Sequence, residues 1–289
     1  MIKKTIITFL LICPFLNVQS EIIKLGNSVL NIQFDDQTAL FSVTDKRCNK
    51  VWKQNALPGN FSVEKTTRTA NSLIILFSGK FRFEAEVKLN DNASFEIILT
   101  ADNEMPVEEF EFPAAFETPD KNHFVLMTDG EGLLLPADDK EYPMSSGISF
   151  YTGGGLAMAW MGMVDDKLEN GYMAILETPY DAGLRTQRTD GLVTFSPVWF
   201  PSMQKFGYSR KVSYHFFDKG GYVAQAKTYR DYIWKKNNVI SLKEKGKRFP
   251  AMDKMIGAVH IYVWDKAREV EFAKELKSSG IEKALILWD

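Results

Sequence analysis

Residues 256–289 carry a strand–helix–strand pattern, and this pattern constrains the fold more than any other part of the sequence. It begins with the apolar run IGAVHIYVWD and ends with the apolar run IEKALILWD. Such continuous apolar runs are typical of parallel strands that are buried on both faces. Between them lies a helical stripe that Gly280 stops, made of Ala267, Val270, Ala273 and Leu276. The segment predicts one right-handed βαβ unit.

A single pair of parallel strands cannot cover its own apolar faces. It also leaves the backbone N–H and C=O groups at its two edges without hydrogen-bond partners. A (β/α)8 barrel solves both problems, but it needs eight such strands and typically about 250 residues. The pattern therefore predicts the start of a truncated (β/α)8 TIM barrel at residues 256–289. On this interpretation the chain is the front part of a longer protein, as a truncated reading frame or a fragment.

Residues 21–217 show a different pattern, in which apolar and polar residues alternate in short segments separated by turn residues. In KFRFEAEVKL, for example, one face carries Phe81, Phe83, Ala85, Val87 and Leu89. The hairpin SVLNIQF-DDQT-ALFSVTD has acidic turn residues between two alternating runs. Many short strands at this spacing predict a large β-sandwich, most simply of two sheets.

Residues 218–255 are predicted to form a partly helical linker between the two domains. Gly220-Gly221 marks the entry of a helix whose apolar face is Tyr222, Ala226, Tyr229 and Ile233. The polar segment NNVISLKEKGKRFP then predicts a connection.

The N-terminus has the layout of a secretory signal peptide. Lys3 and Lys4 precede an apolar stretch that ends at Leu16, and small residues lie before a cleavage site at Ser20. The apolar stretch is too short for a membrane span. Removal of residues 1–20 leaves Cys48 as the only cysteine, which excludes an intrachain disulfide. The protein is expected to be exported to a periplasmic or extracellular location.

Composition narrows the functional classes. The net charge is −2, and no run of Lys or Arg indicates a nucleic-acid partner. The three histidines, His123, His215 and His260, have no metal-ligand spacing, so no metal is expected. No nucleophile motif of the G-x-S-x-G type occurs, and the glycine-rich YTGGGLAMAWMG lacks the Lys of a phosphate loop. No cofactor is expected.

Both predicted parallel strands end in the same dipeptide, Trp264-Asp265 and Trp288-Asp289. The carboxyl ends of barrel strands form the mouth of the active site. An indole can pack on the C–H face of a sugar ring while a carboxylate accepts hydrogen bonds from hydroxyl groups. These four residues are the candidate substrate-binding residues. Alternatively, Asp265 caps the following helix and Asp289 begins a loop.

Several segments together resemble one enzyme group. They are FPAAF, DGEGLLLPADD, GYMAILETPYDAGLR, KFGYSRKVSYHFFDKGGYVAQAKTYRDY and IGAVHIYVWD. They are similar to the glycoside hydrolases related to families 101 and 129, which contain α-N-acetylgalactosaminidases acting on mucin-type O-glycans. The resemblance implies a large β-sandwich of the galactose-mutarotase-like type before a (β/α)8 barrel. It also implies retaining hydrolysis by an Asp nucleophile and a Glu acid/base on later barrel strands, C-terminal to residue 289. Asp289 resembles a sugar-binding aspartate early in that barrel.

The resemblance leads to the expectation of an exported glycoside hydrolase that cleaves α-linked N-acetylgalactosamine, or a related sugar, from O-glycans, with its catalytic half missing from this chain. Two alternatives remain open. One is a non-catalytic carbohydrate-binding β-sandwich protein. The other is a mutarotase-like enzyme that pairs His123 or His215 with Glu117 or Glu177.

Overall fold

The structure, a computed structural model, describes residues 21–56, 61–102, 104–130, 132–142, 148–149, 156–237, 239–263 and 268–288. At positions 148, 149, 237, 263 and 288 it describes the backbone alone. The signal-peptide prediction falls on residues outside these ranges. The chain divides into two compact units, the first ending at Tyr229 and the second beginning at Arg230.

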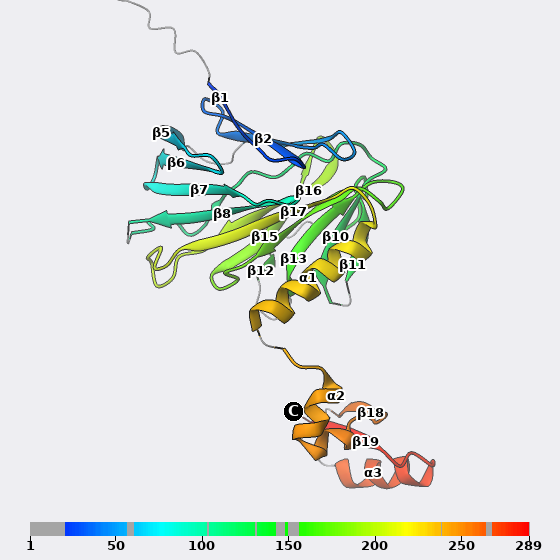
Figure 1. The fold of residues 1–289 in the computed structure, drawn as a ribbon. Coiled ribbons are helices and arrows are strands. Elements are labelled where there is room, and N and C mark those ends of the chain that lie inside the picture. Colours follow the sequence, from blue (N-terminus) through cyan, green and yellow to red (C-terminus); the bar gives the residue numbers. More distant parts are fainter. Residues whose placement is uncertain are drawn as a thin grey trace, which may run out of the picture. The chain divides into compact units, whose positions relative to one another are not determined.

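In the part of unit 1 that the structure describes, the strands form three antiparallel sheets (Figure 1). A four-stranded sheet has the order β1-β2-β3-β4, with bounds Ile22–Gly26, Leu30–Asp35, Leu40–Asp45 and Lys50–Lys53. A second four-stranded sheet has the order β12-β15-β16-β9, with bounds Ile148–Ser149, Ala182–Thr189, Leu192–Trp199 and Phe110–Glu111.

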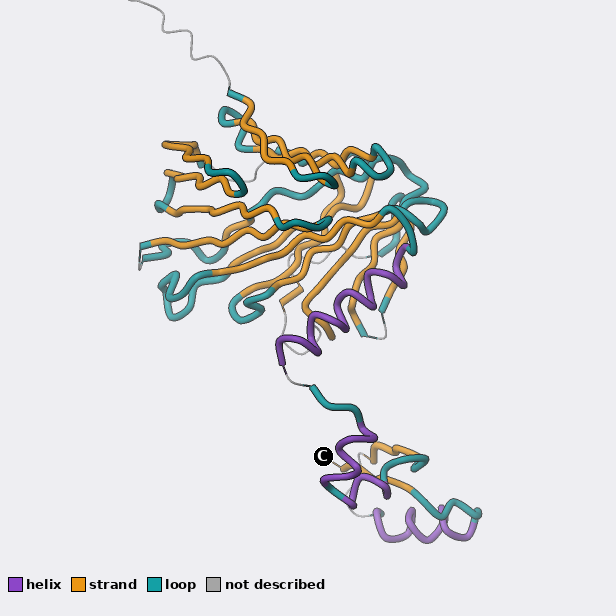
Figure 2. The backbone as a smooth tube through the Cα atoms, viewed as in Figure 1, coloured by secondary structure: helices purple, strands orange, loops and turns teal. Residues whose placement is uncertain are grey.

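The third sheet has nine strands in the order β11-β10-β13-β14-β17-β8-β7-β6-β5. Their bounds in that order are Leu133–Pro136, Phe124–Asp129, Leu156–Val164, Gly171–Leu176, Arg210–Phe217, Ser94–Ala101, Phe83–Leu89, Ser72–Ser78 and Ser62–Arg68. Strands make up most of unit 1 (Figure 2).

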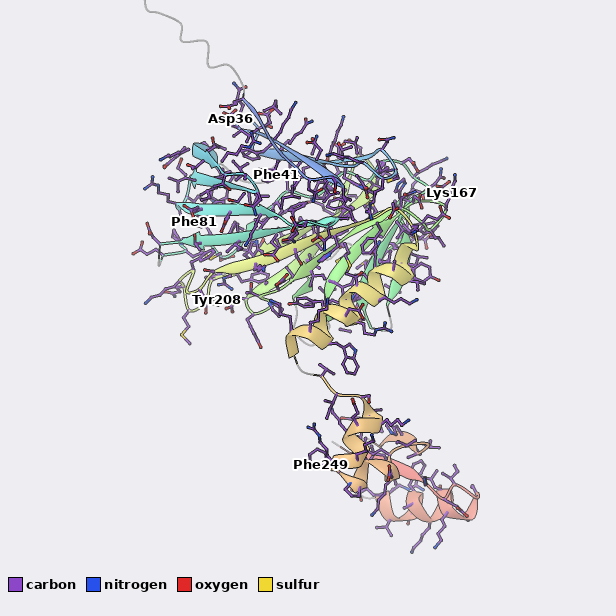
Figure 3. All side chains as sticks on the ribbon, viewed as in Figure 1. Asp36, Phe41, Phe81, Lys167, Tyr208 and Phe249 are labelled. Carbon is purple, nitrogen blue, oxygen red and sulfur yellow. The ribbon has the colours of Figure 1, made fainter. Side chains whose placement is uncertain are left out.

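The predicted β-rich fold is therefore confirmed, but the second layer is split between two short sheets. One continuous cluster of buried side chains includes residues from all three sheets. Two of its members, Phe41 and Phe81, are labelled in Figure 3. Tyr172 shows how they meet. Its ring stacks on Phe195 of β16 at 5.4 Å and meets Trp52 of β4 edge-on at 4.9 Å. The alternating face predicted from Phe81 to Leu89 is buried throughout.

Helix α1, Gly221–Asn237, lies along the nine-stranded sheet (Figure 1). It packs on the face opposite the core, because Gly162 faces it while its neighbours Met161 and Met163 belong to the core cluster. Gln225 of α1 is fully buried, and its side-chain amide donates a hydrogen bond to the carbonyl of Met163 at 3.0 Å.

The predicted apolar face of this helix is only partly confirmed. Tyr229 is buried as predicted, but Tyr222 is 43% exposed and Ala226 is exposed, and Gly221 and Gln225 are buried instead. The reason is the shape of the sheet. Gly162 and Gly171 leave a groove beside β13 and β14 that admits the Gln225 amide, and a Cβ on either glycine would collide with it.

Unit 2 contains the last helices and strands. Helix α2, Leu242–Arg248, begins with a capping box in which Ser241 and Glu244 exchange hydrogen bonds. A 3₁₀ helix, Pro250–Lys254, follows. Strands β18, Val259–Val263, and β19, Ala284–Trp288, pair in parallel and are connected through α3, Glu269–Ser278. The predicted strand–helix–strand order is thus present.

The glycine groove yields a first prediction. Replacing Gly162 with Ala would place Cβ 1.8 Å from Gln225 Oε1 and 3.1 Å from the carbonyl oxygen of Tyr172. We expect Gly162→Ala to lower the free energy of unfolding by about 1–3 kcal/mol, as overpacked sites do. Urea unfolding followed by circular dichroism measures the change.

Gly26→Ala is the matched control, because the nearest atom to its Cβ would lie at 3.5 Å, an ordinary contact. Adding Gln225→Ala to Gly162→Ala should recover part of the loss. Equal effects of the two glycine substitutions would contradict the groove as the reason for the helix position.

Candidate functional site

The carboxyl ends of β18 and β19 are the site that the sequence indicates. The register pairs Val259 with Ala284 and Val263 with Trp288, so both strands end at the same edge. Trp264, Asp265 and Asp289 lie outside the described residues, and the structure gives only the backbone of Trp288. In the register, Trp288 is opposite Val263.

The strands that carry this edge are not buried. Within residues 230–288, no residue whose side chain the structure describes belongs to the buried class. Tyr262 is 55% exposed, and Val259 and Leu287 are each 45% exposed. Parallel strands with such sequences occur almost only where both faces are covered. β18 and β19 therefore have the apolar residues of a buried sheet, but these residues are not buried.

A second group of polar residues lies on β17 and its neighbours in unit 1. Strand alternation places Lys211, Ser213 and His215 on one face of β17, and the register puts Ser213 opposite Glu96 of β8. Lys211 Nζ lies 2.7 Å from a carboxylate oxygen of Glu96 and 3.4 Å from one of Glu177. We call these five residues the β17 cluster.

The electrostatics of the β17 cluster follow from partial burial among charges of both signs. Burial lowers the pKa of Lys211, but the carboxylates of Glu96 and Glu177 outweigh it and leave the pKa above its usual value. Burial lowers the pKa of His215, and the same two carboxylates oppose that shift without reversing it. His215 Nε2 lies 3.3 Å from Ser213 Oγ. A neutral imidazole in this position can accept a proton, and the imidazolium so formed can give it up again.

Of the residues in the mutarotase-like alternative, the structure brings His215 and Glu177 into one cluster. It places His123 elsewhere, next to Lys50 and Asp120. Sequence reasoning missed Glu96, Lys211 and Ser213. The alternation in RKVSYHFF could have indicated Lys211 and Ser213, but only the β8–β17 register shows that Glu96 joins them.

The lowered pKa of His215 yields a second prediction. The unfolded chain binds a proton at this imidazole more readily than the folded chain does, so acidification through the usual histidine pKa of about 6.5 favours unfolding. Wild type should therefore lose stability between pH 7.5 and 5.5, and His215→Gln should lose less. Urea unfolding at both pH values measures this. A histidine proton resonance with an ordinary or raised midpoint, assigned by the same variant, would contradict it.

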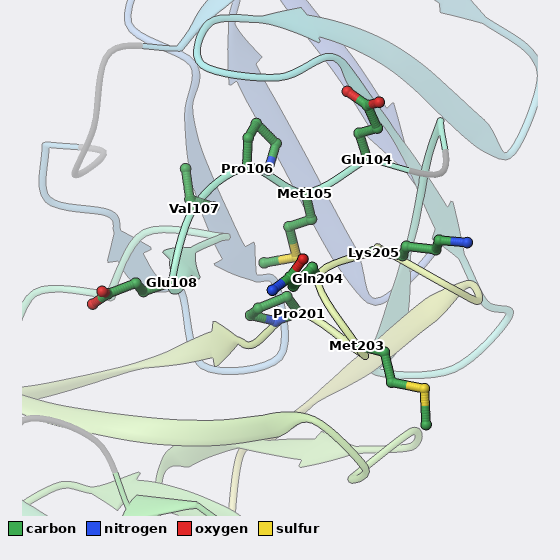
Figure 4. A pocket seen from close by; sticks show the side chains of 9 residues that line it. All are labelled: Glu104, Met105, Pro106, Val107, Glu108, Pro201, Met203, Gln204 and Lys205. Atoms are coloured by element: carbon green, nitrogen blue, oxygen red, sulfur yellow. The ribbon is translucent and has the colours of Figure 1, made fainter.

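A cavity of about 580 Å³ opens at the end of the sandwich (Figure 4). It lies between the segment Glu104–Glu108 and a hairpin whose two turn residues are Met203 and Gln204. Both turn residues have positive φ, at 51° and 66°, and Met203 is 94% exposed. Among the described residues, those that line the cavity include two glutamates, a glutamine and a lysine but no aromatic ring.

The hairpin yields a third prediction. A left-handed conformation costs a residue with Cβ about 1–2 kcal/mol, and glycine does not have this cost. We expect Gln204→Gly to raise the free energy of unfolding by about 1 kcal/mol, measured by thermal unfolding. Lys167→Gly, at an exposed turn position where the backbone is not left-handed, is the contrasting control and should destabilise. If Gln204→Gly lowers the free energy of unfolding, the Gln204 side chain stabilises the fold by more than the left-handed backbone destabilises it.

Two classes of site are not found in the described residues. No group of three His, Cys, Asp or Glu side chains among them is arranged to hold a metal ion. No helix in that part of the chain is long and apolar enough to cross a membrane.

Known proteins similar to this chain were found among solved structures but not among sequences. The sequence matches no protein-family model and no curated protein sequence. Among solved structures it is similar to the α-N-acetylgalactosaminidase NagBb from Bifidobacterium bifidum. The ligand-free form matches with a TM-score of 0.75 and 19% identity, over 92% of this chain and 51% of that chain. The form in complex with N-acetylgalactosamine matches with a TM-score of 0.76 and 20% identity, over the same shares.

This similarity confirms, at the level of the fold, the resemblance to α-N-acetylgalactosaminidases that the sequence motifs indicate. The chain spans about half the length of the NagBb structures. A galactose mutarotase-related enzyme from Lactobacillus acidophilus matches less closely, with a TM-score of 0.40 and 13% identity, over 69% of this chain and 98% of that chain.

Proposed function

We propose that this chain forms the N-terminal part of an exported glycoside hydrolase, in which the β-sandwich precedes a (β/α)8 barrel. One observation carries the proposal, namely the NagBb similarity over 92% of this chain and 51% of that one. Because unit 1 ends at residue 229, a match over 92% of 289 residues has to extend into unit 2. Both units thus share in the similarity.

The parallel pair supports the barrel part of the proposal. The apolar faces of β18 and β19 are largely uncovered within the described residues, and further parallel strands with their helices would cover them. On this proposal residues 21–217 are the sandwich, residues 218–255 the linker, and residues 256–289 the opening of the barrel. Residues 1–20 are the signal peptide that directs export.

The substrate class follows from the same similarity. NagBb is an α-N-acetylgalactosaminidase and has been solved with N-acetylgalactosamine bound. We assign to this chain's enzyme the retaining cleavage of α-linked N-acetylgalactosamine, or a related sugar, from O-glycans. Two carboxyl groups about 5–5.5 Å apart would perform this reaction, and on this proposal they lie C-terminal to residue 289.

The residues of this chain that would touch the sugar are Asp289, Trp288, Asp265 and Trp264. They follow or end paired strands at one sheet edge. Asp289 would accept hydrogen bonds from sugar hydroxyl groups, and the indoles would pack on the ring's C–H face. They bind and orient the sugar, while the catalytic carboxylates break the bond.

Hydrolysis of p-nitrophenyl α-N-acetylgalactosaminide tests the proposal. Residues 21–289 alone should release no p-nitrophenol, and the chain extended through the following reading frame should release it. In the extended chain, Asp289→Asn should lower kcat/KM by about 10–100-fold, the effect of weakening a charged hydrogen bond. Asp166→Asn, at an exposed turn position between β13 and β14, is the matched control and should have no effect.

Two outcomes would overturn the proposal. Turnover by residues 21–289 alone would place the catalytic groups within those residues, with the β17 cluster as the first group to test. Calorimetric binding of N-acetylgalactosamine without hydrolysis by the extended chain would instead favour a non-catalytic carbohydrate-binding protein.

A further inference from the structure

The cavity of about 580 Å³ in unit 1 has apolar walls that come from two segments of the chain. Met105, Pro106 and Val107 lie on one segment, and Pro201 and Met203 lie on the other (Figure 4). Cavities of this volume commonly bind ligands. Met203 is 94% exposed, and Pro106 is exposed as well. Apolar surface is therefore open to a partner at this place.

The hairpin on one side of the cavity is fixed at its base. The backbone groups of Ser202 and Lys205 exchange hydrogen bonds at 2.8 and 3.1 Å. The guanidinium of Arg210, which is fully buried, donates to the carbonyls of Phe200 and Phe206 at 3.2 and 2.8 Å. These bonds hold both strands of the hairpin. Its tip is therefore positioned by the backbone and by Arg210, and a partner would meet a preorganised surface.

The two residues at the tip are unusual for a tight turn. Met203 and Gln204 both have left-handed backbone conformations, in which a Cβ is strained, and Asn and Gly are the usual residues there. The flexible, polarisable side chain of methionine is common on surfaces that bind varied partners. Backbone strain together with apolar exposure is typical of recognition sites, because neither contributes to packing of the core.

Unpaired acidic groups flank the apolar walls. Glu104 and Glu108 line the cavity on opposite sides of Met105 (Figure 4). Neither carboxylate forms an ion pair with another residue that the structure describes. Lys205 is the one cation among the described lining residues, so two carboxylates stand against one ammonium. Residues 102–109 contain four acidic residues and no Lys or Arg. The surface is therefore apolar with a negative rim.

We propose that this cavity binds an extended peptide segment of a partner protein, in which apolar residues are flanked by Lys or Arg. The apolar side chains pack against Met105, Pro106 and Met203. The basic side chains reach Glu104 and Glu108. Charge complementarity favours this occupant over a second copy of the chain, whose own negative rim would be repelled. The binding forms no covalent bond and does not depend on the proposed function.

An NMR titration of the full chain, with 13C-labelled methionine methyl groups, tests the proposal. The probe is a pool of blocked hexapeptides with Lys at both ends and Leu, Val, Pro or Met between them. A second pool has Glu at both ends. We expect the basic pool to shift the Met105 and Met203 resonances and to leave that of Met158, which is exposed on β13, unchanged. The acidic pool should bind about tenfold more weakly.

Three variants separate the contributions of charge and of apolar contact. Glu104→Gln combined with Glu108→Gln should weaken binding of the basic pool about tenfold and remove the difference between the pools. Glu84→Gln combined with Asp166→Asn is the matched control, because it removes the same charge at exposed positions outside this cavity. Met203→Ser should weaken binding of both pools about tenfold. Its unfolding temperature should equal that of wild type, since the side chain is 94% exposed.

Several results would overturn the proposal. One is the absence of shifts at Met105 and Met203 with about 10 mM of the basic pool, a concentration that saturates even a millimolar site. Another is equal affinity for the two pools, or equal affinity of wild type and the double glutamate variant, because binding would then not depend on charge. Shifts of the same two resonances with N-acetylgalactosamine, or with rising chain concentration, in place of the peptide response would identify a sugar or a second copy as the occupant.

Discussion

The fold of unit 1 depends on the aromatic cluster around Tyr172, where rings from separate sheets meet. Tyr172 is fully buried on β14, and it contacts Trp52, Phe116 and Phe195 with centroid distances between 4.9 and 5.4 Å. Each such pair contributes about 0.5–1.5 kcal/mol beyond the area that it buries. Burial also raises the pKa of the Tyr172 hydroxyl well above its usual value, so the ring stays neutral. One residue thereby ties both short sheets to the nine-stranded sheet.

Packing both short sheets on one face leaves the other face of the nine-stranded sheet for α1 and the β17 cluster. Alternation makes this division strict, because each residue next to a core residue points outward. Gly162 lies between Met161 and Met163 of the core, and Ser213 lies between Val212 and Tyr214. The glycine admits a helix, whereas the serine belongs to a row of polar groups. The same periodicity therefore builds the core and positions the outer polar groups.

The strand pattern could be predicted because period-two alternation is local. Phe83, Ala85 and Val87 are buried as the pattern indicates. The face of α1 could be predicted only in part, because the apolar stripe indicated Tyr229 but not the glycines on distant strands that receive Gln225. The β17 cluster depends on register between β8 and β17, which no local pattern encodes. His123 shows the same limit, because its partner Lys50 is remote in sequence and lies on another sheet.

The two units differ in how far their apolar residues are buried. Unit 1 packs a large set of buried aromatic residues against one another, and no aromatic ring is among the described residues that line its 580 Å³ cavity. In unit 2, none of the residues of β18 and β19 whose side chains the structure describes is buried. In the sequence, each of these strands runs into a Trp-Asp dipeptide, which is the sugar-binding pair of the proposed function. Completing that sheet would therefore both stabilise unit 2 and enclose the proposed sugar site.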